Sequence, residues 1–215
     1  MKEVTVVVPA RYIAALMLFA PVSDASRSCL EGIQFEVGAG EMRLVATDGA
    51  RLGVARIPHD EPLELDGPVS AIVPRSLLEG IKASLPVHVV IILGAPADGA
   101  EHARHVTVRA AGVDRVGLTI DARFPDWRRV IPRTVTGEAA QFNPIYVGDL
   151  AKVRKALDPR GDSARVRLAH NGKGTAWIDF GLPDFMGVLM PVVYGDKVPP
   201  LTFPEWAVDD LDSLV

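Results

Sequence analysis

The feature that most constrains this chain is an internal repeat, because a period of this size fixes the architecture before any single motif is considered. Three stretches share one outline, in which a run of β-forming residues is followed by a proline and then by apolar residues at helical spacing. They are Val4–Leu16, Val69–Ile81 and, in a weaker form, Ala140–Leu150. A proline at this boundary predicts a strand that passes directly into a helix, since its fixed φ suits the first helical turn and its missing N–H is not needed there.

Short alternating runs broken by Gly, Asp or Asn follow each predicted helix, which is the pattern of antiparallel strands joined by tight turns. Each repeat is therefore a βαβββ unit, and the fold class is α+β. The strands expected after the three helices cover residues 30–37, 42–47 and 51–57, then 86–93, 104–110 and 114–120, and finally 164–169, 174–180 and 185–193.

Composition divides the chain around these units. Residues 1–123 are expected to form a complete domain of two repeats, and residues 124–137 a connector that contains two prolines. Residues 138–195 then supply one repeat, or half a domain. Residues 196–215 are an acidic tail that we expect to be mobile.

Several classes of function are disfavoured by what the chain lacks. The single cysteine, Cys29, cannot form an internal disulfide, and no spacing of Cys, His or acidic residues predicts a metal or cofactor site. No nucleophile elbow, phosphate loop or dinucleotide fingerprint is present, so we expect no catalytic site. The first residues are too short an apolar run for a signal peptide or a membrane span, which favours a cytoplasmic protein.

Three segments resemble the bacterial DNA polymerase III β sliding clamp family. The stretch Leu44–Leu52 contains Ala-Thr-Asp-Gly-Ala-Arg-Leu and is similar to the ATDGHRL segment of that family's second domain. Arg123–Pro132 resembles the RFPDYRRVLP connector between its second and third domains, and Leu189–Val192 resembles its C-terminal VMPM. Ala50 departs from the pattern, since the family usually has His there.

The resemblance covers residues 3–194 and implies a clamp with sheets on the outside and helices on one face. It also implies a shortened clamp, with the second domain and only the closing half of the third. In the family, partner proteins insert a short apolar peptide into a cleft between these two domains. The matching residues here are Thr47, Gly49, Arg51, Leu52, Pro125, Val130, Val188, Met190, Pro191 and Val192.

The resemblance further implies contact with double-stranded DNA, made by basic side chains on the helices that reach phosphates without reading bases. The candidates are Arg11, Arg75, Lys82, Lys152, Arg154 and Lys155. The chain carries 23 basic and 27 acidic residues, a net charge of −4, so DNA contact requires these cations to be concentrated locally. Solvated surface helices would show the same basic residues.

Clamps of this architecture are rings of twelve βαβββ units, so three units per chain imply a homo-oligomer. A tetramer would pair third repeats across one two-fold axis and first repeats across another; a dimer through third repeats is the simpler alternative. Two functions follow: a processivity factor that encircles DNA and tethers a polymerase, or a truncated relative that only binds clamp-interacting peptides.

Ordinary structural explanations remain for the same segments. A Thr-Asp-Gly turn is usually only a hairpin, and Val188–Met190 reads equally well as a core strand. The tail residues Asp210–Leu214 loosely resemble peptides that bind clamp clefts, but an acidic end without a defined structure would look the same.

Overall fold

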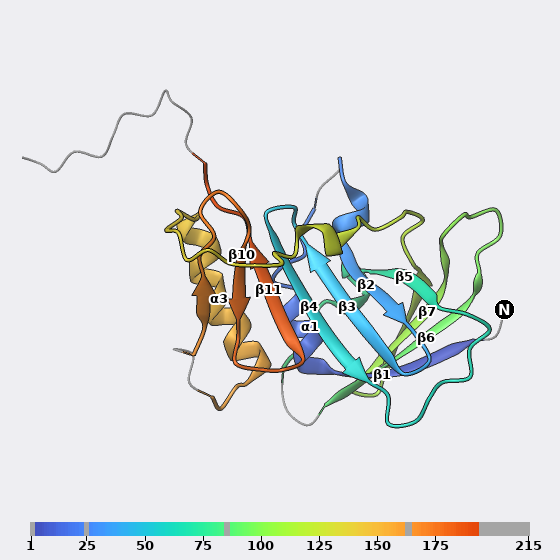
Figure 1. Cartoon of the computed structure of the whole chain (residues 1–215). Helices are drawn as coiled ribbons and strands as arrows, with labels where there is room; N and C mark the ends of the chain where they lie inside the picture. Colours follow the sequence, from blue (N-terminus) through green and yellow to red (C-terminus); the bar gives the residue numbers. More distant parts are fainter. Residues whose placement is uncertain (1–2, 24–25, 84–86, 162–164, 194–215) are drawn as a thin grey trace, which may run out of the picture.

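The computed structural model describes residues 3–23, 26–83, 87–161 and 165–193, and its elements fall into three units, of which the third lacks the expected first strand (Figure 1). The first unit comprises β1 (Val4–Pro9), α1 (Ala10–Leu16), β2 (Gly32–Val37), β3 (Glu41–Thr47) and β4 (Arg51–Pro58). The second comprises β5 (Val69–Pro74), α2 (Arg75–Leu78), β6 (His88–Pro96), β7 (Arg104–Ala110) and β8 (Val113–Leu118). The third comprises α3 (Pro144–Leu157), β9 (Arg167–Ala169), β10 (Ala176–Asp179) and β11 (Phe185–Leu189). Two 3-10 turns, η1 (Ser28–Leu30) and η2 (Trp127–Val130), lie between them.

The prolines stand where strands become helices, as the sequence predicts. Pro9 and Pro74 are the N-cap residues of α1 and α2, with φ of −58° and −65°. In the third unit, Asn143 caps α3 by accepting a hydrogen bond from the Ile145 N–H at 3.0 Å, and Pro144 is the first helical residue. A proline therefore lies at the start of all three helices, as the N-cap residue of α1 and α2 and as the first helical residue of α3.

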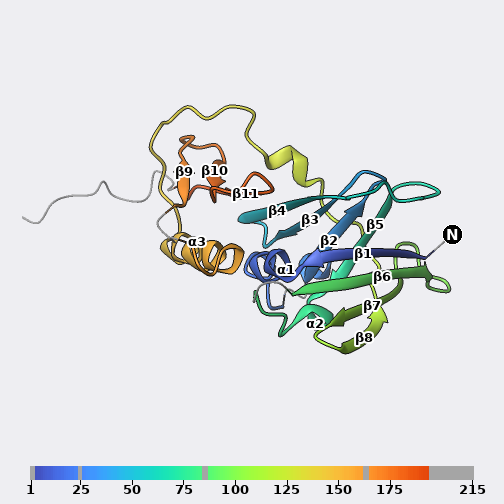
Figure 2. The same ribbon diagram turned by 90° about the horizontal axis from the view of Figure 1, so that it is seen from below.

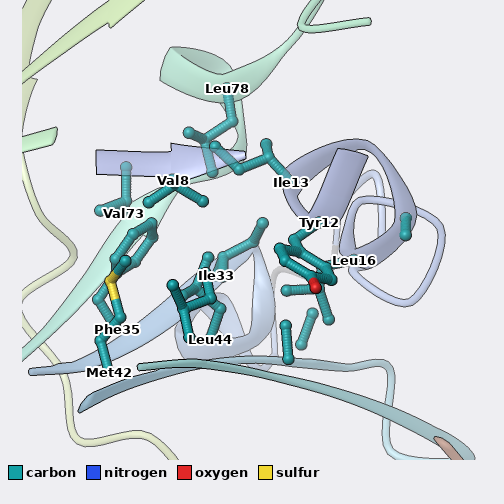
Figure 3. Close-up of a cluster of buried hydrophobic side chains, with 14 of the residues drawn as sticks. Val8, Tyr12, Ile13, Leu16, Ile33, Phe35, Met42, Leu44, Val73 and Leu78 are labelled. Atoms are coloured by element: carbon teal, nitrogen blue, oxygen red, sulfur yellow. The ribbon is translucent and has the colours of Figure 1, made fainter. Parts of the chain in front are cut away.

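The first two units exchange their first strands. β1 leaves its own unit to pair with β6, and β5 pairs with β2, both antiparallel. The resulting four-strand orders, β1-β6-β7-β8 and β5-β2-β3-β4, are equivalent. The two sheets enclose one core with α1, which Figure 3 shows from the side chains of Val8, Tyr12, Ile13, Leu16, Ile33, Phe35, Met42, Leu44, Val73 and Leu78.

The third unit extends the first through its last strand. β11 pairs antiparallel with β4, from Phe185 opposite Ala55 to Leu189 opposite Arg51, so that one sheet of seven strands crosses both units. On the other layer α1 and α3 pack side by side (Figure 2). The first unit therefore lies between the second and the third, and its last strand is already paired within the chain.

Two local expectations also differ from the structure. No strand forms over residues 140–143, because in this fold a first strand joins the sheet of a sibling unit, and the described residues contain no sibling for the third unit. Instead the chain before α3 bonds to its own unit, with the Gly172 N–H donating to the Glu138 carbonyl at 2.9 Å. Helix α2 is only four residues long and ends before Lys82.

The exchanged strand β5 leaves no room beside Gly32. A methyl group there would overlap the backbone carbonyl of Val73. We expect Gly32→Ala to lower the free energy of unfolding by about 1–3 kcal/mol, because a strand must move to admit the added atom. Gly67→Ala, where an added methyl meets nothing within 4 Å, is the matched control and should change it by less than about 0.5 kcal/mol. Urea unfolding measures both, and equal effects would contradict the close packing of β5 on β2.

Candidate functional site

A groove of about 350 Å³ lies over the junction of β4 and β11, and its lining includes the three segments expected from the sequence. We call it the junction groove. One wall is the turn between β3 and β4, the second is the connector around η2, and the third is the end of β11. Eight of the ten expected cleft residues line it: Thr47, Gly49, Arg51, Leu52, Pro125, Val130, Val188 and Met190. The other two do not: Pro191 and Val192 follow Met190, and the Val192 N–H bonds to the Gln141 carbonyl at 2.8 Å.

Side-chain hydrogen bonds fix the turn that forms the first wall. The Asp48 carboxylate accepts from the Ala50 and Arg51 N–H groups at 2.9 and 2.8 Å, and the Thr47 hydroxyl donates to the Arg51 carbonyl at 2.6 Å. Gly49 takes a φ of +90°, which few other residues adopt. This rigid turn leaves the apolar side chain of Leu52 facing the groove.

The head group of Arg51 serves the junction between units. Its guanidinium donates to Asp48 at 2.9 Å, to Asp149 on α3 at 2.8 Å and to the Leu18 carbonyl at 3.0 Å, and lies over the Tyr146 ring at 4.3 Å. Hydrogen bonds from Lys152 and Arg51 hold the pKa of Asp149 below its ordinary value, although partial burial opposes this. Arg51 therefore ties the turn of the first unit to the helix of the third.

The connector is held on the sheet by Glu36 of β2. Its carboxylate accepts from the Trp127 indole N–H at 2.9 Å and from Arg128 at 2.6 Å. Burial opposes ionisation of Glu36, but the hydrogen bonds from Arg128 and Trp127 outweigh it, so the pKa of this carboxyl lies below its ordinary value. The Trp127 ring packs against a buried cluster of Val45, Leu52, Val54 and Val188.

Sequence reasoning did not identify several residues of the site. Arg27, Cys29, Leu30 and Trp127 also line the junction groove. The sequence could have identified Trp127, because the connector motif contains it. No local pattern marks the segment around η1 as part of the groove. Its residues reach the groove only because the chain between α1 and β2 folds back over the β3–β4 turn.

The basic residues expected to meet DNA have mixed surroundings. Arg75 donates to the Met17 and Ala20 carbonyls at 2.9 and 3.0 Å, and Arg154 is 5% exposed and paired with Asp158 at 3.0 Å. Arg11 is half-buried, with its guanidinium over the Tyr12 ring. The structure corrects the placement of three candidates: Arg75 and Arg154 are internal partners rather than free surface cations, and Lys82 is not on a helix. Lys152 and Lys155 remain exposed on α3.

Comparison with known proteins places the chain in a family. Residues 4–126 match the family model described as the DNA polymerase III beta subunit, central domain. That match covers more than half of the chain, and the protein therefore belongs to the DNA polymerase III beta subunit family. Among the described residues no helix is long and apolar enough to cross a membrane, and no cluster of His, Cys, Asp and Glu would hold a metal ion.

Individual relatives agree with this assignment. The beta sliding clamp of Haemophilus influenzae is 31% identical over 153 residues, which are 71% of this chain and 40% of that protein. The beta sliding clamp of Escherichia coli K12 is 35% identical over 122 residues, 54% of this chain and 29% of that protein. The chain thus spans less than half the length of the curated relatives it matches.

Solved structures show the same fold. The DNA polymerase III subunit beta of Pseudomonas aeruginosa superposes with a TM-score of 0.65 at 19% identity, over 89% of this chain and 67% of that one. The beta subunit of Thermotoga maritima gives 0.63 at 17% identity, over 89% and 66%. The expected clamp fold is confirmed.

Replacing Arg51 tests the junction. Arg51→Leu should lower the free energy of unfolding by about 3–5 kcal/mol, since it leaves two carboxylates near α3 without their common cation. Arg167→Leu removes an exposed cation that pairs with Asp179, and it should cost less than about 1 kcal/mol. Urea unfolding followed by circular dichroism compares the two, and similar losses would show that Arg51 does not hold the units together.

Proposed function

We propose that this protein is a sliding-clamp-like processivity factor for DNA replication, which acts in the cytoplasm and tethers a polymerase or other partners to DNA. The observation that carries the proposal is the junction groove, because three segments remote in sequence meet there on the fold of the family. A partner would insert a short peptide into it. The role is one of binding and needs neither catalysis nor a cofactor.

The lining of the junction groove suits a peptide with apolar anchors. Leu52, Val130, Val188 and Met190 offer branched and thioether side chains, and methionine adapts its shape to different apolar groups at little strain. A short peptide with apolar side chains is therefore the proposed ligand.

Contact with DNA would come from α3, whose exposed Lys152 and Lys155 are able to meet phosphates of either strand. Two lysines per chain give little affinity alone, so encirclement requires a homo-oligomer, either a dimer or a tetramer, in which several such helices converge.

A second candidate is a clamp relative that binds partner peptides without encircling DNA. The internal contacts of Arg75 and Arg154 favour it, because they withdraw two cations from any DNA-facing surface. The net charge of −4 points the same way.

Peptide binding is tested by substitutions at exposed residues of the groove, because such substitutions are not expected to unfold the protein. Met190 is 46% exposed, and Val130 also lies partly open. Met190→Glu and Val130→Glu should each weaken binding of a fluorescent short peptide with leucine anchors at least tenfold, because they place a carboxylate among its apolar contacts. Fluorescence anisotropy gives the affinities. Val135→Glu, outside the groove, is the control; unchanged binding in the groove variants would exclude the groove as the peptide site.

DNA encirclement separates the two candidates. A protein that surrounds DNA should stay on closed circular plasmid in gel filtration and leave after the plasmid is cut once. Replacing Lys152 and Lys155 by Gln should also reduce the salt dependence of binding, whereas Lys173→Gln, on the β9–β10 turn, should not. Equal retention on circular and linear DNA, or none on either, would leave the peptide-binding role as the function.

A further inference from the structure

β8 is an outer edge of the four-stranded sheet, paired with β7 on one side only (Figure 2). Its side chains on the outer face of the sheet are unusually apolar for an edge: Val116 is 72% exposed and Leu118 48%. The strand is six residues long and contains neither lysine nor proline. An exposed apolar edge of this kind is a template for pairing with another strand.

The charges of β8 do not protect this edge. Asp114 is paired with Arg109 of β7, with contacts of 2.7 and 2.8 Å, so the two charges largely cancel. Arg115 turns away from the outer face and donates to the Leu77 and Glu79 carbonyls of the α2 segment at 3.1 and 2.6 Å. The contrast is β9, an edge of only three residues, since short edge strands are one way in which proteins block edge pairing.

The chain itself shows what such an edge binds. In the equivalent strand orders β5-β2-β3-β4 and β1-β6-β7-β8, β8 stands where β4 stands, and β4 uses its outer edge to pair antiparallel with β11. All three are the last strands of their units. Pairing of one last strand with another is therefore the contact by which the first and third units connect.

The registers of the two hairpins make the comparison direct. In the β3–β4 hairpin Leu52 pairs with Thr47, five residues earlier, and in the β7–β8 hairpin Asp114 pairs with Arg109, also five residues earlier. Two residues further along, Val116 thus occupies in β8 the place of Val54 in β4. Val54 has Met186 of β11 opposite it, packs with Trp127 of the connector and is 5% exposed, whereas Val116 is 72% exposed. The same site is covered in one sheet and bare in the other.

We propose that β8 pairs antiparallel with β8 of a second copy of this chain across a two-fold axis, which continues the four-stranded sheet into the partner and places Val116 and Leu118 in the contact. A second copy fits because two identical strands satisfy antiparallel pairing through an exact two-fold axis, and each supplies the same apolar residues to the other. The contact is argued from this chain's own strand pairing and does not depend on the proposed function.

The full chain tests this pairing in solution. Light scattering after gel filtration should give a mass twice 23.1 kDa at micromolar concentration. The double variant Val116→Lys and Leu118→Lys should weaken self-association at least tenfold, since four lysines would meet at the axis. Ile145→Lys, a matched change at a 70% exposed residue of α3, should leave it intact.

Hydrogen exchange provides a readout that does not depend on a variant. Amides of residues 113–118 should become more protected as the concentration of the wild-type protein rises through the dimer range. A wild-type monomer at 100 µM overturns the proposal. So does a dimer that survives both lysines, and a dimer that Ile145→Lys abolishes while the β8 variant keeps it, which would assign the contact to the third unit.

Discussion

The antiparallel pairing of β4 with β11 is the interaction on which the rest of this structure depends. It joins two strands that are more than a hundred residues apart in the chain and makes one sheet of seven strands. Arg51, at the first position of β4, adds a second attachment on the helix side through Asp149 and Tyr146. Helix α3 also packs beside α1, so the third unit is held to the first on both layers.

The junction groove follows from that pairing. The β3–β4 turn and the end of β11 become its opposite walls because the Met190 N–H bonds to the Ala50 carbonyl at 2.9 Å. The connector forms a further wall because Trp127 and Arg128 donate hydrogen bonds to the Glu36 carboxylate, which holds the connector on the sheet. A binding surface built in this way is only as stable as the contact between the units. The pairing of β4 with β11 therefore determines both the architecture and the proposed binding site.

Edge strands account for the remaining organisation. The first two units cover each other's inner edges by exchanging β1 and β5, and the first and third units cover two last strands by pairing them. β8 is left as a long apolar edge, and the third unit keeps a first segment without strand pairing.

The sequence alone determined the local structure. Pro9, Pro74 and the Asn143–Pro144 pair start the helices because φ restriction and side-chain capping act within a few residues, and the Asp48–Gly49 turn is set in the same way. Motif order also located eight residues of the junction groove. Only the tertiary structure decided which strands pair, where the guanidiniums of Arg51, Arg75 and Arg154 are bound, and that no strand forms before α3. Those outcomes depend on partners distant in sequence, whose positions are fixed by packing and not by any local pattern.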